Sequence, residues 1–275
     1  MELSTNHLVL APDASIDLQM HTTYSDGAWT PEQLIDYLVG EKFGLVAITD
    51  HDRVDTIASL QYLAVQKQLP VLVAAEMSTS WKGEATDVLC YSFDPQEKEL
   101  QDLAQDVLRR QQEITQDVYQ KLLRKGYVFP RQQEVLKESG GEPSQANDLA
   151  ALLEQHGYGD EETSFNIVFD EGFFFATNDI AAVVDAVHHS GGVCLIAHPG
   201  RGKTSSAMMS PCWINSVRKF PLTASRLIIL YTRQNKPLCI WSMLRTTIYW
   251  SAQAQTHTAQ AKNQSNTVQT SADAS

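Results

Sequence analysis

The sequence predicts an α/β fold in which strands and helices alternate, and it favours a barrel over an open sheet. Short, almost wholly apolar runs, typical of strands buried on both faces, alternate with longer segments whose apolar residues recur every three or four positions. Residues that can bind metals follow several of the apolar runs, where parallel strands would end. These two observations predict the fold class and indicate that the candidate functional residues meet at one end of the barrel.

The first strand–helix–strand unit is the clearest part of the pattern. Residues 16–20 and 45–48 are expected to form buried strands, with residues 31–42 as the crossover helix. Thr30 is a suitable N-cap before a proline, and Gly44 lies just beyond the C-terminal end. Because both strands would point the same way, the side chains that follow them should meet at one rim.

The next elements continue the alternation. Residues 55–68 should form a second crossover helix, followed by a third buried strand over residues 71–78 that carries Glu76 at its C-terminal end. After a short turn, residues 86–93 should form a fourth strand, with Asp87 near its start.

A long helix is predicted for residues 95–125, ended by Gly126. Residues 127–175 show a less regular pattern, with a short helix over residues 143–156 and an aromatic loop at residues 173–175. We interpret residues 97–175 as a helical insertion beside the barrel.

The chain then returns to the alternating pattern. Asn178 is expected to cap a helix over residues 179–189, and residues 193–197 should form a strand that leads to His198.

The composition excludes several functional classes. A net charge of −12 argues against duplex DNA binding through a broad basic face. The sequence contains no apolar run long enough to span a membrane, and its N-terminus lacks a signal-peptide pattern. The four cysteines form no C-x-x-C pair, so we expect free thiols and a cytoplasmic location.

The residues at the expected strand ends predict a metal site. His21, His51, Glu76 and His198 each follow or end a different strand, and Asp26 lies in a Ser-Asp-Gly turn that could fold back over the rim. Any one of these histidines alone would more often be a satisfied buried residue. Together they favour a site for several metal ions, because imidazole and carboxylate groups are the usual ligands of hydrolytic metals.

Two acids flank His51 in the sequence. Either Asp50 or Asp52 could bind a metal, but orienting His51 through its other ring nitrogen is the safer assignment.

Four strings resemble the PHP (polymerase and histidinol phosphatase) family in family order: D-L-Q-M-H-T-T-Y-S-D-G, T-D-H-D, E-M-S and A-H-P-G-R. The resemblance covers residues 16–201. It implies a distorted (β/α)7 TIM-like barrel, incomplete at the C-terminus, that binds two or three divalent metals: manganese, iron, zinc or magnesium. Members with a helical insertion at this place are similar to 3′,5′-nucleoside bisphosphate phosphatases and 5′–3′ exoribonucleases.

Carried over by position, the resemblance assigns the metal ligands: His21, Asp26, His51, Glu76 and His198, with Glu76 bridging. It also places Arg201 beside the substrate phosphate, so that Arg201 and Asp50 are the candidate catalytic residues. Two histidines of the family pattern are replaced here by Gln19 and Asp87, which we keep as candidate ligands. A third family histidine aligns, loosely, with Asn147. A neutral amide oxygen is a weak ligand for zinc or manganese. The last family motif, Ser-Asp-x-His, is absent.

The composition changes abruptly near Gly202. After Arg201 there are eight Lys or Arg and one acid, a charge of +7, so the first 201 residues carry −19; all fourteen glycines lie at or before Gly202. We back-translated residues 252–263 with degenerate codons and started each new codon on the third base of the old one. The shifted codons can encode A-G-S-D-S-H-S-P-G-K-K, which contains the missing motif. We therefore predict that residues 1–201 form the metallo-phosphoesterase barrel and that residues 202–275 are an out-of-frame, poorly ordered tail.

The expected function is that of a metal-dependent phosphoesterase acting on a small phosphorylated substrate or a short nucleic-acid end. The main alternative is a catalytically dead, truncated barrel, which Gln19 and the lost final motif favour. Histidinol-phosphatase-like activity is a further alternative. A polymerase-associated proofreading module is disfavoured because no polymerase sequence accompanies these motifs.

Overall fold

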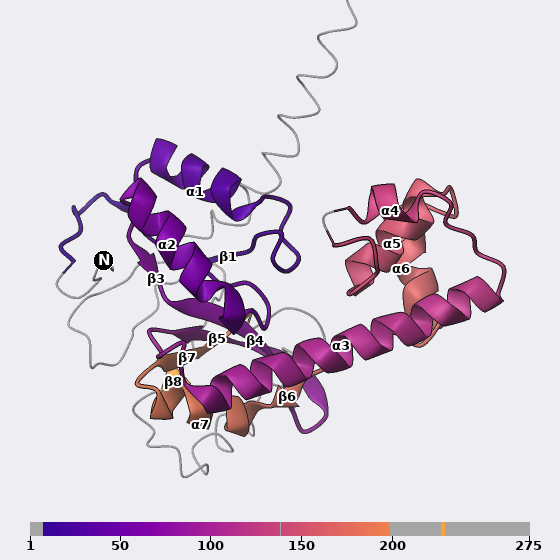
Figure 1. The fold of residues 1–275 in the computed structure, drawn as a ribbon. Coiled ribbons are helices and arrows are strands. Elements are labelled where there is room, and N and C mark those ends of the chain that lie inside the picture. The colour runs from indigo at the N-terminus through magenta and orange to yellow at the C-terminus, as the bar shows by residue number, and fades with distance from the viewer. Residues whose placement is uncertain (1–7, 138, 199–226, 229–275) are drawn as a thin grey trace, which may run out of the picture. The chain divides into compact units, whose positions relative to one another are not determined.

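The computed structural model describes residues 8–137, 139–198 and 227–228, which form two β-sheets and their flanking helices (Figure 1). The predicted α/β class is confirmed. The hydrogen-bonded strands of the described residues form two separate sheets and do not close into a barrel. None of the helices in this part of the chain has the length and apolar content needed to cross a lipid bilayer.

The first sheet is parallel and follows the prediction closely. It contains β1 (Ser15–Met20), β2 (Phe43–Ile48) and β3 (Val71–Leu72) in that order. Helices α1 (Pro31–Gly40) and α2 (Ile57–Lys67) pack their apolar side chains against it.

Local sequence explains where these helices begin and end. Thr30 caps α1 and forms a capping box with Gln33, as its position before a proline predicts. A short 3-10 turn, η1 (Val54–Thr56), precedes α2, and Gln68 ends α2 in the left-handed conformation. The assignment of Gly44 to the end of α1 is wrong. Gly44 lies within β2, where a Cβ would come within 2.9 Å of Ala14 Cβ.

The second sheet is mixed, in the order β6-β4-β5-β7-β8. Its strands are β4 (Ala74–Trp81), β5 (Glu84–Tyr91), β6 (Asn178–Asp179), β7 (Val193–Ile196) and β8 (Leu227–Ile228). β5 is antiparallel to β4 and to β7, whereas β4–β6 and β7–β8 are parallel.

The predicted single strand over residues 71–78 is wrong, because the chain leaves the first sheet after β3 and enters the second as β4. Glu76 consequently lies inside β4 and not at its C-terminal end. The turn that follows, at Lys82 and Gly83, has φ of 52° and 81°, the left-handed pair that matches the twist of a tight hairpin.

Although the sheets are separate, their side chains share an interior. A cluster of buried residues combines Ala47 of β2 with Ala74, Leu89, Tyr91 and Ala197 from the segments of the second sheet. The sheets are also linked through the backbone, since His51 and Glu76 form an isolated parallel bridge.

The helical insertion is built on α3 (Lys98–Arg124), which is longer than any other helix in the described part of the chain (Figure 1). Leu100 and Ala104 pack with α7 (Ile180–His189) and the second sheet, whereas Val118 and Leu122 belong to a separate core. This second core also contains side chains of α5 (Ala146–Gln155) and α6 (Glu161–Asp170).

Three details of this region differ from the prediction. The sequence pattern did not reveal α6 or the short α4 (Gln132–Val135). The cap of α7 is Asp179, which accepts hydrogen bonds from the backbone N–H groups of Ala181 and Ala182; Asn178 lies in β6 and contacts Arg110 instead. A carboxylate at the residue before the first helical turn is the better-placed acceptor.

The tail prediction is only partly within the described residues. Leu227 and Ile228 pair with Cys194 and Leu195 of β7, so this short part of the tail, which we expected to be poorly ordered, forms a strand. The physical reason is that strand pairing uses backbone groups and suits an apolar, β-branched run of almost any origin. The rest of residues 202–275 lies outside the described residues.

Candidate metal centre

Glu76 is the centre of the site. Its side chain is fully buried on β4, and three polar side chains converge on its carboxylate. Gln19 Nε2 donates to Oε2 at 2.9 Å, His21 Nε2 lies 3.2 Å from the same oxygen, and His198 Nε2 lies 3.2 Å from Oε1. These residues come from β1 and from the segments that follow β1 and β7, so the predicted convergence of strand ends is what the structure contains.

Asp26 and His51 complete one side of the site. Asp26 Oδ1 lies 3.3 Å from His21 Nδ1, and Asp26 Oδ2 lies 3.9 Å from His51 Nε2. The two imidazole rings are stacked, with centroids 4.9 Å apart. One ligand atom from each of the three residues falls within 4.8 Å of the others, a spacing that suits a shared cation.

The charges within the site are strongly coupled. Burial opposes the ionisation of Glu76, but its contacts with His198 and His21 outweigh burial and hold the pKa of Glu76 well below its ordinary value. Burial likewise opposes protonation of His21, yet its contact with Glu76 and the charge of Asp26 raise the pKa of His21 overall. Glu76 is therefore ionised, and its negative charge favours any cation in its surroundings.

Three buried atoms of the site make no hydrogen bond within the described part of the chain: His21 Nδ1, His51 Nδ1 and Glu76 Oε1. Buried polar atoms without partners are costly, and imidazole nitrogens and carboxylate oxygens are the donors that zinc, manganese and iron accept. The residues present therefore fit a divalent cation.

Asp50 has a different role from its neighbours. It is 2% exposed and accepts hydrogen bonds from the Thr22 N–H at 2.6 Å, the Thr22 hydroxyl at 2.7 Å and the Ser25 hydroxyl at 2.9 Å. These bonds fix the loop that carries His21 and Asp26. The expected hydrogen bond from an acid to His51 Nδ1 is not present among the described residues.

The same loop makes a close turn at Gly27. A Cβ built there would lie 2.2 Å from the His21 carbonyl oxygen, so only glycine fits. The Gln145 side chain, at the start of α5, donates to the Ser25 carbonyl oxygen at 3.1 Å and links the insertion to this loop. Thr22, Ser25 and Gln145 were missed by sequence reasoning, because their roles depend on which acid they reach in space.

The remaining acids line the other side of the site. Asp52 is buried and accepts from the Ser78 N–H at 3.0 Å, and burial raises the pKa of Asp52 to about 6. Asp87 lies within electrostatic reach of His51, Glu76 and His198; burial raises its pKa above the ordinary value.

Two sequence candidates do not contribute a described contact. Arg201 lies outside the described residues, and Asn147 is an exposed residue in the first turn of α5. Their proposed roles stay predictions.

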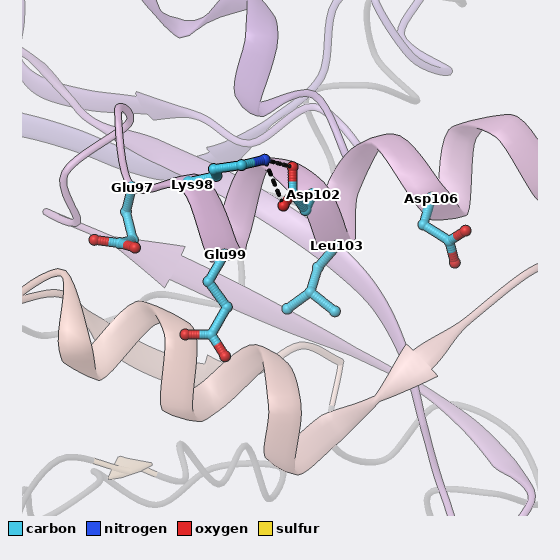
Figure 2. Close-up of a pocket in the computed structure, with 6 residues that line it drawn as sticks. All are labelled: Glu97, Lys98, Glu99, Asp102, Leu103 and Asp106. Atoms are coloured by element: carbon cyan, nitrogen blue, oxygen red, sulfur yellow. Dashed lines mark hydrogen bonds and ion pairs between the residues drawn. The ribbon is translucent and has the colours of Figure 1, made fainter.

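A hollow on the surface of α3 is lined by none of the histidines of the candidate site. Figure 2 shows its lining by Glu97, Lys98, Glu99, Asp102, Leu103 and Asp106, with Lys98 paired to Asp102 at 2.7 Å. It contains no imidazole, and its acids face solvent, so it offers none of the converging donors found around Glu76.

No protein-family model matches the chain. Sequence relatives are nevertheless clear. The chain is 25% identical over 190 residues to a 5′–3′ exoribonuclease of Haemophilus influenzae, covering 67% of this chain and 69% of the relative. It is 28% identical over 213 residues to the 5′–3′ exoribonuclease Rnm of Escherichia coli, covering 74% and 69%. It is also 36% identical to a 3′,5′-nucleoside bisphosphate phosphatase of Chromobacterium violaceum over 87 residues, 32% of this chain and 30% of the relative.

Solved structures share the fold. A protein of Bifidobacterium adolescentis described as a metal-dependent phosphoesterase superposes with a TM-score of 0.65 at 19% identity, covering 75% of this chain and 74% of that one. An amidohydrolase from Chromobacterium violaceum superposes with a TM-score of 0.60 at 24% identity and covers 74% of each chain. The resemblance predicted from the four motifs is thus confirmed: the relatives of this chain are hydrolases, and its fold is similar to that of a metal-dependent phosphoesterase.

Proposed function

We propose that this chain hydrolyses a phosphate ester with the help of divalent cations held by His21, Asp26, His51, Glu76 and His198. The observation that carries the proposal is that His21 and His198 contact the fully buried Glu76, while the exposed Asp26 lies against the imidazoles of His21 and His51. Partner-free nitrogen and oxygen atoms at the same place support a cation-binding role.

Each residue has a distinct task in this proposal. Divalent cations, when bound, would polarise the phosphate and make water a better nucleophile at neutral pH. Glu76 supplies the buried negative charge between the two sides of the site, and Asp50 keeps the loop of His21 and Asp26 in place. We assign Arg201 to the substrate phosphate, where its planar guanidinium suits a two-point contact.

The proposed substrates are a nucleoside 3′,5′-bisphosphate or the 5′ end of a short RNA. The names of the relatives support this choice, since they describe an exoribonuclease and a 3′,5′-nucleoside bisphosphate phosphatase. We place the catalytic unit in residues 1–201. A cytoplasmic location is part of the same proposal and agrees with the free thiols of Cys90 and Cys194.

The first test is phosphate release from a nucleoside 3′,5′-bisphosphate and from a 5′-phosphorylated trinucleotide in the presence of manganese. We expect activity that His51→Ala and Glu76→Gln each reduce by roughly 100-fold or more, the size of effect seen when groups that hold a metal are removed. His189→Ala is the matched control, because His189 is an exposed histidine on α7 that pairs with Glu99 at 3.6 Å and is not part of the site. Equal rates in all variants would refute the assignment of this site.

The second candidate function is a non-catalytic barrel, which Gln19 favours because its amide stands where a stronger ligand would be expected. A protein of this kind should retain less than one equivalent of metal after purification and should release no phosphate from either substrate. Metal content and activity measured on the same sample separate the two candidates.

A further inference from the structure

The side-chain amide of Gln19 lies between two of the groups that face the centre of the site. Its Nε2 is 2.9 Å from Glu76 Oε2 and 3.0 Å from His198 Nε2. Gln19 is half-buried on β1, so its amide approaches from the first sheet, whereas Glu76 belongs to the second.

The hydrogen bond to Glu76 sets the orientation of this amide. The nitrogen donates to Glu76 Oε2, whereas a flipped amide would place Oε1 against the same carboxylate, oxygen to oxygen. As it stands, Gln19 presents N–H groups to the site, and an amide nitrogen with its hydrogens cannot bind a cation.

The contacts of His198 cannot all be satisfied at once. Its Nε2 lies 3.0 Å from the Gln19 nitrogen, a hydrogen-bond donor, and 3.2 Å from Glu76 Oε1, an acceptor. If Nε2 carries a proton, two hydrogen-bond donors face each other at the Gln19 amide. If Nε2 carries a lone pair, two acceptors face each other at the Glu76 carboxylate. A cation between His198 and Glu76 Oε1 would satisfy both lone pairs, but the Gln19 amide nitrogen already lies 3.0 Å from His198 Nε2.

The two sides of the site therefore differ in how well their ligand atoms are placed to bind a cation. On one side, the ligand atoms of His21, Asp26 and His51 lie within 4.8 Å of one another. On the other, around His198, Glu76 Oε1 and Asp87, the Gln19 amide nitrogen competes with any cation for the lone pair of His198 Nε2.

We propose that this chain binds one divalent cation tightly at His21, Asp26 and His51, and that Gln19 keeps a second cation at His198 and Glu76 weak. The proposal rests on the proposed metal-dependent function and specifies its stoichiometry. Gln19 acts as a specificity-determining residue: it sets how many cations the site holds at a given metal concentration.

The test is a calorimetric titration of the full-length, chelator-treated chain with manganese, which needs no substrate. The chain as it stands should show one tight site. Gln19→Glu replaces the competing nitrogen by a carboxylate oxygen, a ligand that manganese prefers, and should tighten the second site by roughly tenfold or more. Gln66→Glu makes the same charge change on an exposed position of α2 and should leave one tight site.

Gln19→Ala provides an independent check if the glutamate variant does not fold. It removes the competing N–H groups without adding a ligand, so the second cation should bind several-fold more tightly than in the unchanged chain. Two equally tight sites in the unchanged chain, or a second site that neither substitution strengthens, would overturn this inference alone. No manganese binding at all would instead overturn the proposed function.

Discussion

The loop that carries His21 and Asp26 offers a sharp test of which acids position the site and which bind metal. Asp50 is 2% exposed and accepts three hydrogen bonds, whereas the Asp26 side chain is 48% exposed and points its two oxygens at the imidazoles of His21 and His51. We expect Asp50→Ala to destabilise the fold far more than Asp26→Ala, and both substitutions to weaken cation binding.

The expected cost of Asp50→Ala follows from its contacts. A hydrogen bond to an ionised group contributes about 1.5–3 kcal/mol, and a buried donor that loses its partner costs about 1–3 kcal/mol. The bonds share one acceptor and are not additive, so we expect a loss of about 3–5 kcal/mol in the free energy of unfolding. Thr22, which is 0% exposed, bears most of this cost because water does not replace its lost acceptor. Asp26→Ala should change the same free energy by about 1 kcal/mol or less, since an exposed ion pair contributes little.

Urea unfolding of the chelator-treated protein, followed by far-ultraviolet circular dichroism, measures both values. Manganese titration of the folded variants should then show weaker binding in both. Asp50→Ala displaces the loop that carries the ligands, and Asp26→Ala removes a ligand. The reasoning fails if Asp50→Ala costs less than about 1 kcal/mol, or if Asp26→Ala is the more destabilising of the two.

Two further predictions concern the metal and the insertion. Manganese at 100 times its dissociation constant should stabilise the folded chain by about 2.7 kcal/mol, or about 5–10 °C in Tm for a chain of this size. Asp26→Ala should abolish most of that shift, and an unchanged Tm in the unmodified chain would contradict a bound cation. Leu149→Ala, at a fully buried position among α3, α5 and α6, should cost about 3 kcal/mol in urea unfolding while leaving manganese affinity within about twofold, because this cluster contains no residue of the metal site. A large loss of affinity would show that the insertion shapes the site more directly than its contacts indicate.

The parts of the fold that the sequence predicted well are those specified by local physics. The capping box at Thr30 and Gln33 and the periodicity of α2 and α3 depend on neighbours in the chain, so a short window of sequence contains the information. His21 and His198 follow β1 and β7, as the sequence pattern indicated, but Glu76 lies inside β4, in a mixed sheet that the pattern did not predict.

The errors have a physical pattern as well. The sequence pattern of residues 71–78 is that of one apolar strand. The break between β3 and β4 arises because β3 pairs within the first sheet and β4 within the second, which a local pattern does not encode. The antiparallel pairing of β5 with β4 and β7 is a tertiary outcome that strand periodicity does not encode. α6 has few apolar residues on its buried face, with Ser164 and Val168 its fully buried positions, so its pattern was too weak to detect.

The pairing of β8 with β7 bears on the tail in a specific way. A parallel partner satisfies backbone groups along the edge of β7, and an apolar, β-branched sequence can supply it in either reading frame. The pairing therefore agrees with a native tail and with a shifted one, and the charge and glycine break at Gly202 stays the reason to predict a shift. Codons after Gly202 that forbid the hidden Asp and His of residues 252–263 would end that prediction.

The sequence does not show which of several neighbouring acids binds a metal and which supports the structure. Burial and hydrogen bonding distinguish the two roles. Asp50 and Asp52 flank His51 and look alike in the sequence, yet both oxygens of Asp50 accept hydrogen bonds from Thr22 or Ser25. Glu76 is equally buried, but its Oε1 makes no hydrogen bond within the described part of the chain and lies 3.2 Å from His198 Nε2. A buried acid saturated by donors supports structure, whereas one left with an open lone pair among imidazoles is placed to bind a cation. This distinction is the reason to assign Glu76 to the metal and Asp50 to the loop.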